Sequence, residues 1–185
     1  MRKSRHPGKY RRAFRFLLVS LLLALCGCGL GSGSAAQGEK ARPAPSPGPT
    51  PARKRMPAFA LKDTAGRQVS LTDFRGKVLL VDFWATWCAP CKTEMPGYER
   101  LYRTYKDRGF AVVGIAADSD PKLIAEFGKM LGVTYPLLVN GMNVARYGVQ
   151  GLPTTILVDR NGIIRKQVIG FEYTRVFENA LRAIL

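Results

Sequence analysis

The chain has 185 residues, enough for one folded domain with additional segments, and a formal net charge of +16. Residues 1–55 contain 12 lysine and arginine residues against one acid, whereas residues 56–185 contain 17 against 12. Most of the excess charge therefore lies outside the second part, which also lacks a basic run interleaved with aromatic residues, so the sequence argues against nucleic-acid binding.

The first 28 residues have the pattern of an export leader. Residues 1–15 hold seven basic residues and no acid, and residues 16–25 form an uncharged, mainly apolar run. That run is shorter than the roughly 20 residues that span a bilayer, so a secretory signal is favoured over the alternative, an uncleaved anchor helix. The arginine pair at 11–12 resembles a twin-arginine signal, which leaves the export route open.

The segment Leu25-Cys26-Gly27-Cys28 resembles the cleavage box of bacterial lipoproteins. The resemblance implies that Cys28 becomes the first residue and carries a lipid, while cleavage removes Cys26. Cys88 and Cys91 then remain as one pair. We therefore expect a membrane-anchored lipoprotein outside the cytoplasmic membrane, facing the periplasm or the cell exterior.

Residues 29–56 are predicted to be a disordered tether. Glycine, serine and alanine dominate its first part, and five prolines alternate with other residues between positions 43 and 51. Such a composition cannot bury a hydrophobic core. Residues 53–55 are a basic cluster that could contact anionic lipid, although a solvated cluster is the favoured interpretation. The folded domain is expected over residues 57–185.

The first half of this domain is predicted to contain a hairpin and a strand–helix–strand unit. The hairpin joins residues 59–61 to residues 68–71 through a turn-rich loop. A β-rich apolar run at 78–83 predicts a strand buried on both faces, and it contains one acid, Asp82. A helical pattern follows at about 89–108 and a second apolar strand at 110–116, which implies parallel pairing of the two strands.

The second half is predicted to continue with helices and an antiparallel pair of strands. A helix starts at the sequence Asp118-Ser119-Asp120-Pro121, with five apolar residues at core spacing: Leu123, Ile124, Phe127, Met130 and Leu131. A short helix is expected at 143–147. Asn161-Gly162 predicts a tight turn between strands at 154–159 and 163–170, and an amphipathic helix at 174–185 closes the domain.

The Cys-x-x-Cys pair, Cys88 and Cys91, lies where the buried strand ends and the first long helix begins. The unpaired N–H groups of a helix N-terminus stabilise a thiolate, so we expect a lowered pKa for the first cysteine, which should be partly exposed. Residues three apart on one helical turn can close and reopen a disulfide. Pro90 suits the first helical turn, and Pro96 should kink the helix without ending it. His6 is the only histidine, so no imidazole metal site is expected in the domain.

These residues resemble the thioredoxin active-site signature, in Val81-Asp82-Phe83-Trp84-Ala85 and Trp87-Cys88-Ala89-Pro90-Cys91. The continuation Cys91-Lys92-Thr93-Glu94-Met95-Pro96 resembles the membrane-tethered TlpA/ResA type. The resemblance implies an α/β thioredoxin fold with a central mixed sheet, an N-terminal β-hairpin and a central helical insertion.

The resemblance also implies roles for individual residues. Cys88 would be the nucleophile and Cys91 the resolving thiol. Asp82 would be the buried acid that exchanges the Cys91 proton, the alternative being an acid paired within the fold. Pro153, in Gly151-Leu152-Pro153, would be the cis proline against the cysteines, the alternative being an ordinary turn proline. Residues flanking these positions would contact substrate: Trp87, Ala89, Pro90 and Leu152.

Two further side chains near the pair have more than one interpretation. Glu94 could tune a thiol, as the resemblance implies, or simply be a first-turn acid that favours the helix dipole. Trp84 is expected to pack in the core, and Trp87 to present a surface to partner proteins.

The expected activity is thiol–disulfide exchange on exported proteins, most simply as a reductant, with no cofactor beyond the two sulfurs. By resemblance, candidate substrates are apocytochrome c and copper-centre proteins, and electrons would come from a membrane thiol reductant of the DsbD/CcdA type. Three alternatives are a disulfide-installing oxidant, a peroxidase of the alkyl hydroperoxide reductase type and a copper-binding assembly factor. The peroxidase would need a proline in the loop before Cys88 that is missing here, and the copper factor would need Cys-x-x-x-Cys and a distant histidine.

Overall fold

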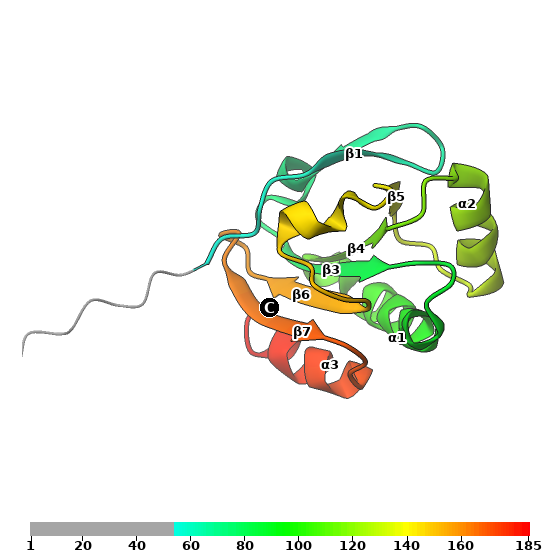
Figure 1. Cartoon of the computed structure of the whole chain (residues 1–185). Coiled ribbons are helices and arrows are strands. Elements are labelled where there is room, and N and C mark those ends of the chain that lie inside the picture. The colour runs from blue at the N-terminus through cyan, green and yellow to red at the C-terminus, as the bar shows by residue number, and fades with distance from the viewer. Residues whose placement is uncertain (1–53) are drawn as a thin grey trace, which may run out of the picture. The chain divides into compact units, whose positions relative to one another are not determined.

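The computed structural model describes residues 54–185, which form one seven-stranded mixed sheet with helices packed on it (Figure 1). The strand order across the sheet is β2-β1-β5-β4-β3-β6-β7. The strands are β1 (Ala60–Asp63), β2 (Gln68–Ser70), β3 (Val78–Trp84), β4 (Phe110–Ala116), β5 (Leu137–Val139), β6 (Thr154–Val158) and β7 (Ile164–Ile169).

Residues 54–185 also contain three α-helices and three short 3₁₀ helices. The α-helices are α1 (Ala89–Tyr105), α2 (Pro121–Met130) and α3 (Thr174–Arg182), and the 3₁₀ helices are η1 (Leu71–Phe74), η2 (Lys106–Arg108) and η3 (Asn143–Tyr147). Helix α1 continues through Pro96, as the sequence predicts. No helix within residues 54–185 is both long and apolar enough to cross a membrane.

The centre of the sheet is the predicted strand–helix–strand unit. Strand β3 is buried along its whole length, pairs in parallel with β4 and pairs antiparallel with β6. In this register Trp84 lies opposite Ala116, and Phe83 lies opposite Thr154. The carboxyl ends of β3 and β4 and the amino end of β6 therefore meet at one edge of the sheet, where ligand and active sites of α/β folds usually lie.

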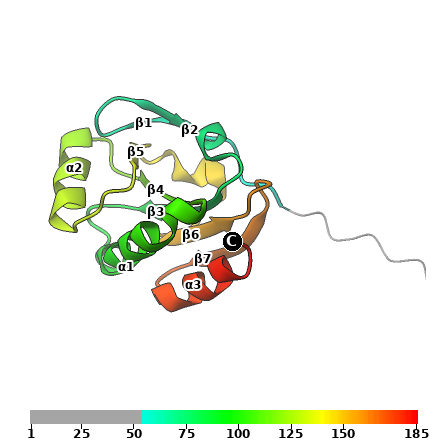
Figure 2. The same ribbon diagram turned by 180° about the vertical axis from the view of Figure 1, so that it is seen from behind.

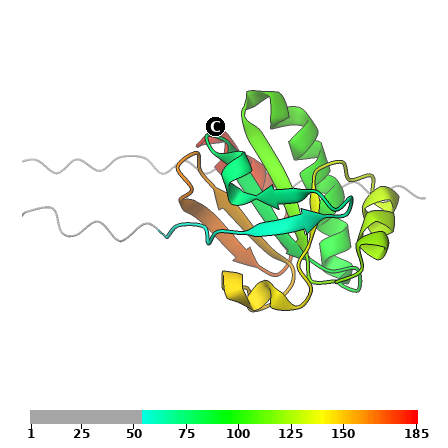
Figure 3. The ribbon, with the colours of Figure 1, turned by 90° about the horizontal axis from the view of Figure 1, so that it is seen from above.

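Each face of the sheet carries its own apolar cluster. Helices α1 and α3 cover one face, where Leu80 and Trp84 of β3 pack with Tyr98 and Phe177 (Figure 2). The 3₁₀ helices η1 and η3 cover the other face, where Phe83 packs against Tyr147 with 5.4 Å between ring centroids (Figure 3). Because side chains alternate along a strand, β3 contributes to both clusters.

The predicted N-terminal hairpin and central insertion are both present. Strands β1 and β2 pair antiparallel, and β1 also pairs with β5, a short strand that the sequence analysis did not predict. The predicted core spacing of α2 is partly wrong. Ile124 is buried, but Leu123 and Met130 are 37% and 66% exposed, because this helix packs with one narrow face at the β5 side of the sheet.

The fold begins earlier than the predicted boundary at residue 57. The N–H of Ile164 donates to the carbonyl of Lys54, the N–H of Met56 donates to the carbonyl of Gly162, and Met56 is buried in the second cluster. Residues 54–56, which the sequence analysis assigned to the tether, thus form part of the sheet edge. The predicted leader and Cys28 lie outside the described residues.

Candidate functional site

The two cysteines form a disulfide at the amino end of α1. The sulfur–sulfur distance is 2.01 Å and the Cα atoms are 5.4 Å apart. Cys88 is the N-cap residue of α1, and its Sγ lies 3.4 Å from the backbone N–H of Cys91, which donates to it. A sulfur in this position faces the positive end of the helix, which is the environment that stabilises a thiolate.

Cys88 is less exposed than predicted. Only 5% of Cys88 and none of Cys91 is accessible, because both sulfurs turn inward against the cluster beneath α1. The residues around the pair are open instead: Ala89 and Pro90 are exposed, and Trp87 is 64% exposed. Trp84 is fully buried, as predicted for a packing residue. A partner that reaches Cys88 must therefore contact Trp87, Ala89 and Pro90 first.

An unpredicted contact fixes the loop that precedes Cys88. The Thr86 N–H and hydroxyl each donate a 2.8 Å hydrogen bond to the carboxylate of Asp118, which follows β4. The sequence analysis placed Asp118 at the start of α2, but the N-cap of that helix is Asp120. The contact joins residues 32 positions apart, so no local pattern could reveal it.

Pro153 is preceded by a cis peptide bond and lies at the same edge of the sheet as the disulfide. Residue 154 faces Phe83 in the sheet register, which brings Leu152 into the cluster that contains Cys88 and Cys91. The carbonyl of Pro153 accepts a 2.7 Å hydrogen bond from Gly170. Leu152 therefore packs against the same cluster as the cysteines, and Pro153 follows it immediately before β6.

Asp82 lies on the face of β3 that α1 covers, between Leu80 and Trp84 in the alternation of the strand. It is fully buried, and neither carboxyl oxygen has a hydrogen-bond partner within residues 54–185. Burial raises its pKa well above the usual value, and the nearby Glu94 raises it further, with a smaller opposite effect from the Thr155 hydroxyl. Asp82 forms no ion pair with any residue from 54 to 185, so the alternative, an acid paired within the fold, has no support in this part of the chain.

Glu94 is buried in the second turn of α1, so its interpretation as a first-turn acid is wrong. Its Oε1 accepts a 2.6 Å hydrogen bond from the backbone N–H of Glu172, while Oε2 has no partner in the described residues. Burial raises the pKa of Glu94 to about 7, and the hydrogen bond from Glu172 partly offsets that rise. Glu94 can therefore gain or lose a proton near neutral pH.

Tyr98 and Thr155 lie among these two acids. Their hydroxyl oxygens are 3.0 Å apart, and Thr155 faces Asp82 across the β3–β6 pair. Burial raises the pKa of Tyr98 above its ordinary value, so the phenol stays neutral. We refer to Asp82, Glu94, Tyr98 and Thr155 as the buried polar cluster. It supplies two acids and two hydroxyls on the face of the sheet that α1 covers, behind the disulfide.

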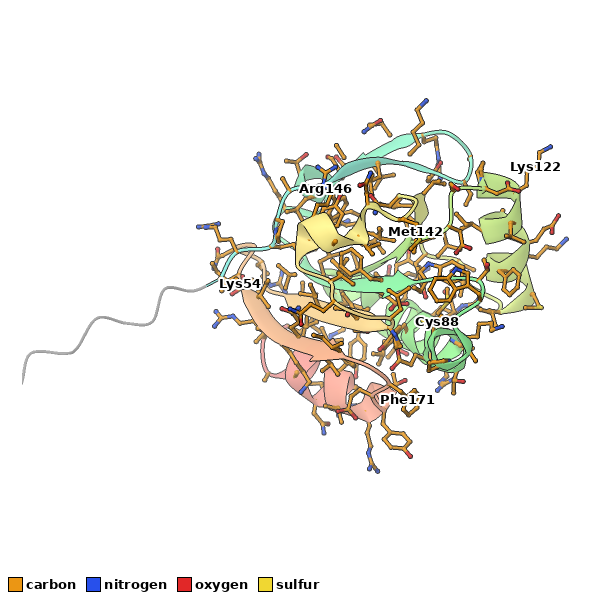
Figure 4. The ribbon with its side chains drawn as sticks, viewed as in Figure 1. Lys54, Cys88, Lys122, Met142, Arg146 and Phe171 are labelled. Carbon is orange, nitrogen blue, oxygen red and sulfur yellow. A yellow bond between two sulfur atoms is a disulfide. The ribbon has the colours of Figure 1, made fainter. Side chains whose placement is uncertain are left out.

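A pair of exposed aromatic residues stands beside the site. Phe171 is 44% exposed (Figure 4) and Tyr173 is 61% exposed. Their rings meet edge to face, with 5.3 Å between centroids. We call residues 170–173, which connect β7 to α3, the aromatic loop. Hydrogen bonds of Gly170 to Pro153 and of Glu172 to Glu94 attach the loop to the site. The sequence analysis did not single out this loop.

Comparison with known proteins agrees with this geometry. A model of the AhpC/TSA family matches residues 52–167. The chain belongs to that family. A thiol-disulfide oxidoreductase ResA of Geobacillus thermodenitrificans is 39% identical over 62% of this chain and 67% of its own length. A thioredoxin-like protein YneN of Bacillus subtilis is 37% identical over 69% of this chain and 77% of its own length.

A solved structure shares the fold. A putative thiol:disulfide interchange protein DsbE from Chlorobium tepidum superposes with a TM-score of 0.67 at 32% identity, covering 71% of this chain and 96% of that one. With the disulfide, these relatives make this family member a thiol–disulfide oxidoreductase with a thioredoxin-like fold, acting on disulfide-bearing proteins. The fold class and the enzyme class predicted from the sequence are confirmed.

Among residues 54–185, no group of three or more histidine, cysteine, aspartate or glutamate side chains is placed to hold a metal ion. Strand β3, which ends four residues before Cys88, is buried along its length and contains no proline.

Proposed function

We propose that this oxidoreductase reduces disulfides of exported proteins, with Cys88 as the nucleophile and Cys91 as the resolving thiol. The observation that supports these roles is the asymmetry of the pair. The Cys88 sulfur faces the Cys91 N–H at the end of α1 and lies beside exposed residues, whereas Cys91 is completely buried. Only a sulfur that a partner can reach can begin the exchange.

In the reduced enzyme, the Cys88 thiolate attacks one sulfur of the substrate disulfide, and the other substrate sulfur leaves as a thiolate. The Cys91 thiol then loses its proton and attacks the Cys88 sulfur. The second substrate sulfur leaves, and the Cys88–Cys91 disulfide forms. Two electrons have passed to the substrate, whose sulfurs each take up a proton. No diffusible cofactor takes part in these steps.

Asp82 is proposed to accept the Cys91 proton. A buried acid without a hydrogen-bond partner can take up and return a proton with little rearrangement. Glu94, whose pKa is about 7, is proposed to adjust the charge around that step. Leu152, which precedes Pro153, is proposed to offer its backbone groups to an extended substrate segment, with Trp87, Ala89 and Pro90 on its other side.

The substrates proposed are exported proteins with cysteines close together, such as apocytochrome c or copper-centre proteins. A membrane thiol reductant of the DsbD/CcdA type would return the enzyme to its dithiol form. We also propose that the chain is a lipoprotein outside the cytoplasmic membrane, anchored through Cys28. Replacing Cys28 with serine should then release the protein into the soluble fraction, and unchanged membrane retention and mass would contradict lipidation.

Trapping tests the proposed roles of the cysteines. The Cys91→Ser variant should accumulate a mixed disulfide with a protein substrate, because no second thiol is left to resolve it. The Cys88→Ser variant should form little or none. Equal trapping by both variants would overturn the assignment. The direction of electron flow is tested by the reduction potential: a value near about −270 mV supports a reductant, and one near about −120 mV makes the protein an oxidant.

A further inference from the structure

A second feature lies at the end of the sheet away from the disulfide. There, a cavity of about 390 Å³ opens between η1 and the turn that joins β6 to β7. Leu71 and Phe74 give it an apolar wall, and four basic residues line it: Arg55, Arg75, Lys77 and Arg160. Thiol–disulfide exchange does not require this arrangement, and the residues do not contact the buried polar cluster.

Two of these four cations donate hydrogen bonds to backbone carbonyl oxygens. Arg160 donates to the carbonyl oxygens of Gly76 and Leu185. Arg55 donates to the neutral carbonyl of Asn161. Arg55, Arg75 and Lys77 form no ion pair with any residue from 54 to 185. The cavity therefore keeps an uncompensated positive charge.

The acids near the cavity do not cancel this charge. Asp159, the only acid that lines it, is 2.6 Å from Arg165 and also accepts hydrogen bonds from backbone N–H groups. Its pKa is held below the ordinary value by those N–H groups and by Arg165, in spite of burial. Asp159 therefore stays ionised and is already neutralised by its own partner.

The positive charge extends over the surrounding surface. Residues 106–108, which contribute two cations and one acid, lie close by, because the carbonyl of Gly109 accepts a hydrogen bond from Val78 at the start of β3. Asp73 is the other acid in this region. We call the exposed surface formed by six cations the basic pole: Lys54, Arg55, Arg75, Lys77, Lys106 and Arg108. Six cations face two acids, which leaves a net charge of +4.

The basic pole and the disulfide lie at opposite ends of β3. The strand has seven residues, which at roughly 3.3 Å per residue separates its ends by about 20 Å. Figure 4 shows Lys54 and Cys88 at opposite ends of the domain. Residue 53 is joined to Lys54, so the first 53 residues, with their apolar run, are attached at the basic pole.

We propose that the basic pole rests on an anionic phospholipid surface, with headgroup phosphates at the mouth of the cavity. Cations spread over a broad face match a sheet of negative charge, whereas one small anion could reach only a few of them. The apolar wall of the cavity suits the glycerol and upper acyl carbons beside a phosphate. In this orientation the disulfide points away from the bilayer. The inference goes beyond the proposed function, since exchange on a substrate does not depend on it.

The test measures where the full chain is protected by lipid. The protein is mixed at low ionic strength with vesicles of phosphatidylcholine alone, or with phosphatidylglycerol added, and lysine acetylation is followed by peptide mass spectrometry. Lys77 should react several-fold more slowly on vesicles that contain phosphatidylglycerol. Lys122, exposed on α2 toward the disulfide end, should react at the same rate throughout. High salt should remove the protection.

Matched variants locate the effect. Arg75→Glu should abolish the protection of Lys77, and the milder Arg75→Gln should weaken it. Lys129→Glu, an equally exposed change on α2, should leave it intact. All variants should reduce a small aromatic disulfide at the normal rate, which separates a failure here from a failure of the proposed function.

Several outcomes would overturn the proposal. One is equal labelling of Lys77 with neutral and anionic vesicles, and another is equal protection of Lys122. If inorganic phosphate alone protected Lys77 from acetylation, the basic pole would be a binding site for a small anion and not for a bilayer. If Lys77 were still protected in the Arg75→Glu variant, the protection would come from another surface of the protein.

Discussion

The backbone N–H of Glu172 donates a 2.6 Å hydrogen bond to Oε1 of Glu94, across 78 positions of sequence. The bond joins two parts of one site, because Glu94 belongs to the buried polar cluster and Glu172 belongs to the aromatic loop. An ionised carboxylate accepts such a bond more strongly than a neutral one. The ionisation of a buried acid and the position of the exposed aromatic loop are therefore coupled.

Glu94 should make the protein less stable as the pH rises. Its pKa is about 7 in the folded state and 4.5 in an unfolded chain, so the fold favours the neutral acid. The contribution of Glu94 to the free energy of unfolding is complete below pH 4.5, where both states are protonated. It falls between pH 4.5 and 7, where only the unfolded chain ionises, and it is constant above pH 7. The loss should reach about 3 kcal/mol, measured as the free energy of unfolding in urea at pH 5 and pH 8.

The Glu94→Gln variant should reduce this pH dependence, since glutamine cannot ionise and its side-chain oxygen can still accept the hydrogen bond from Glu172. Asp82, whose pKa is also raised, should account for the part that remains. Glu126→Gln, an exposed change on α2, serves as the control and should behave like the unchanged protein. An identical pH dependence in Glu94→Gln would show that Glu94 does not titrate in this range.

Asp82→Asn should slow the second step of exchange and spare the first. Asparagine fills the same space but cannot accept the Cys91 proton, so decay of the mixed disulfide should slow by at least about tenfold. Attack by Cys88 on a small disulfide should stay within about twofold of normal. Rapid-quench analysis separates the two steps, with Asp107→Asn as an exposed control. Equal slowing of both steps would argue against a proton-transfer role.

Phe171→Ser and Tyr173→Ser should weaken turnover of protein substrates but not of small ones. Loss of an aromatic contact of about 1 kcal/mol corresponds to a roughly fivefold lower kcat/KM for insulin disulfide reduction. The rate with a small aromatic disulfide should not change. Met130→Ser is the matched control, because Met130 is 66% exposed on α2. Equal losses with both kinds of substrate would mean that the loop supports the fold and not recognition.

Gly97→Ala should destabilise the contact between α1 and α3. A Cβ atom at Gly97 would clash with Oγ1 of Thr174 and lie 3.1 Å from its Cβ, so the Thr174 side chain must rotate or the two helices must move apart. Overpacking of this kind costs about 1–3 kcal/mol. The double variant with Thr174→Ala should recover most of that loss, because it removes the closest atom. Urea unfolding of the four proteins gives the coupling energy, and additive losses would contradict the contact.

Local patterns were sufficient to predict the main features of the site. The Cys-x-x-Cys spacing, the buried strand before it and the amphipathic helix after it all depend on neighbouring residues. Trp84 is buried as expected, and Cys88 lies at the predicted helix start, although it is less exposed than expected. The features that were missed depend on distant residues. Strand β5 has only three residues and is a strand because β4 and β1 flank it. The bond from Thr86 to Asp118 likewise exists only after β3 and β4 have paired.

The burial of individual side chains was harder to predict than their secondary structure. Leu123 and Met130 have the spacing of core residues, yet the sheet is too narrow at β5 to cover them. Glu94 is a charged residue of the kind that usually lies on the surface of a helix. It is nevertheless buried, because α3 and the aromatic loop cover this part of α1. A periodic pattern gives the face of a helix, but only the neighbouring elements decide how much of that face is covered.

The contrast between the two tryptophans gives the molecule two separate optical probes. Trp84 is completely buried beneath α1, and Trp87 is 64% exposed beside the disulfide. The emission of an indole in a dry core lies at shorter wavelength than that of an indole in water, so the two side chains contribute at different wavelengths. Trp84 reports the integrity of the core, and Trp87 reports a partner that covers the disulfide. Unfolding should therefore shift the emission of Trp84 to longer wavelength, whereas a bound partner should shift that of Trp87 to shorter wavelength.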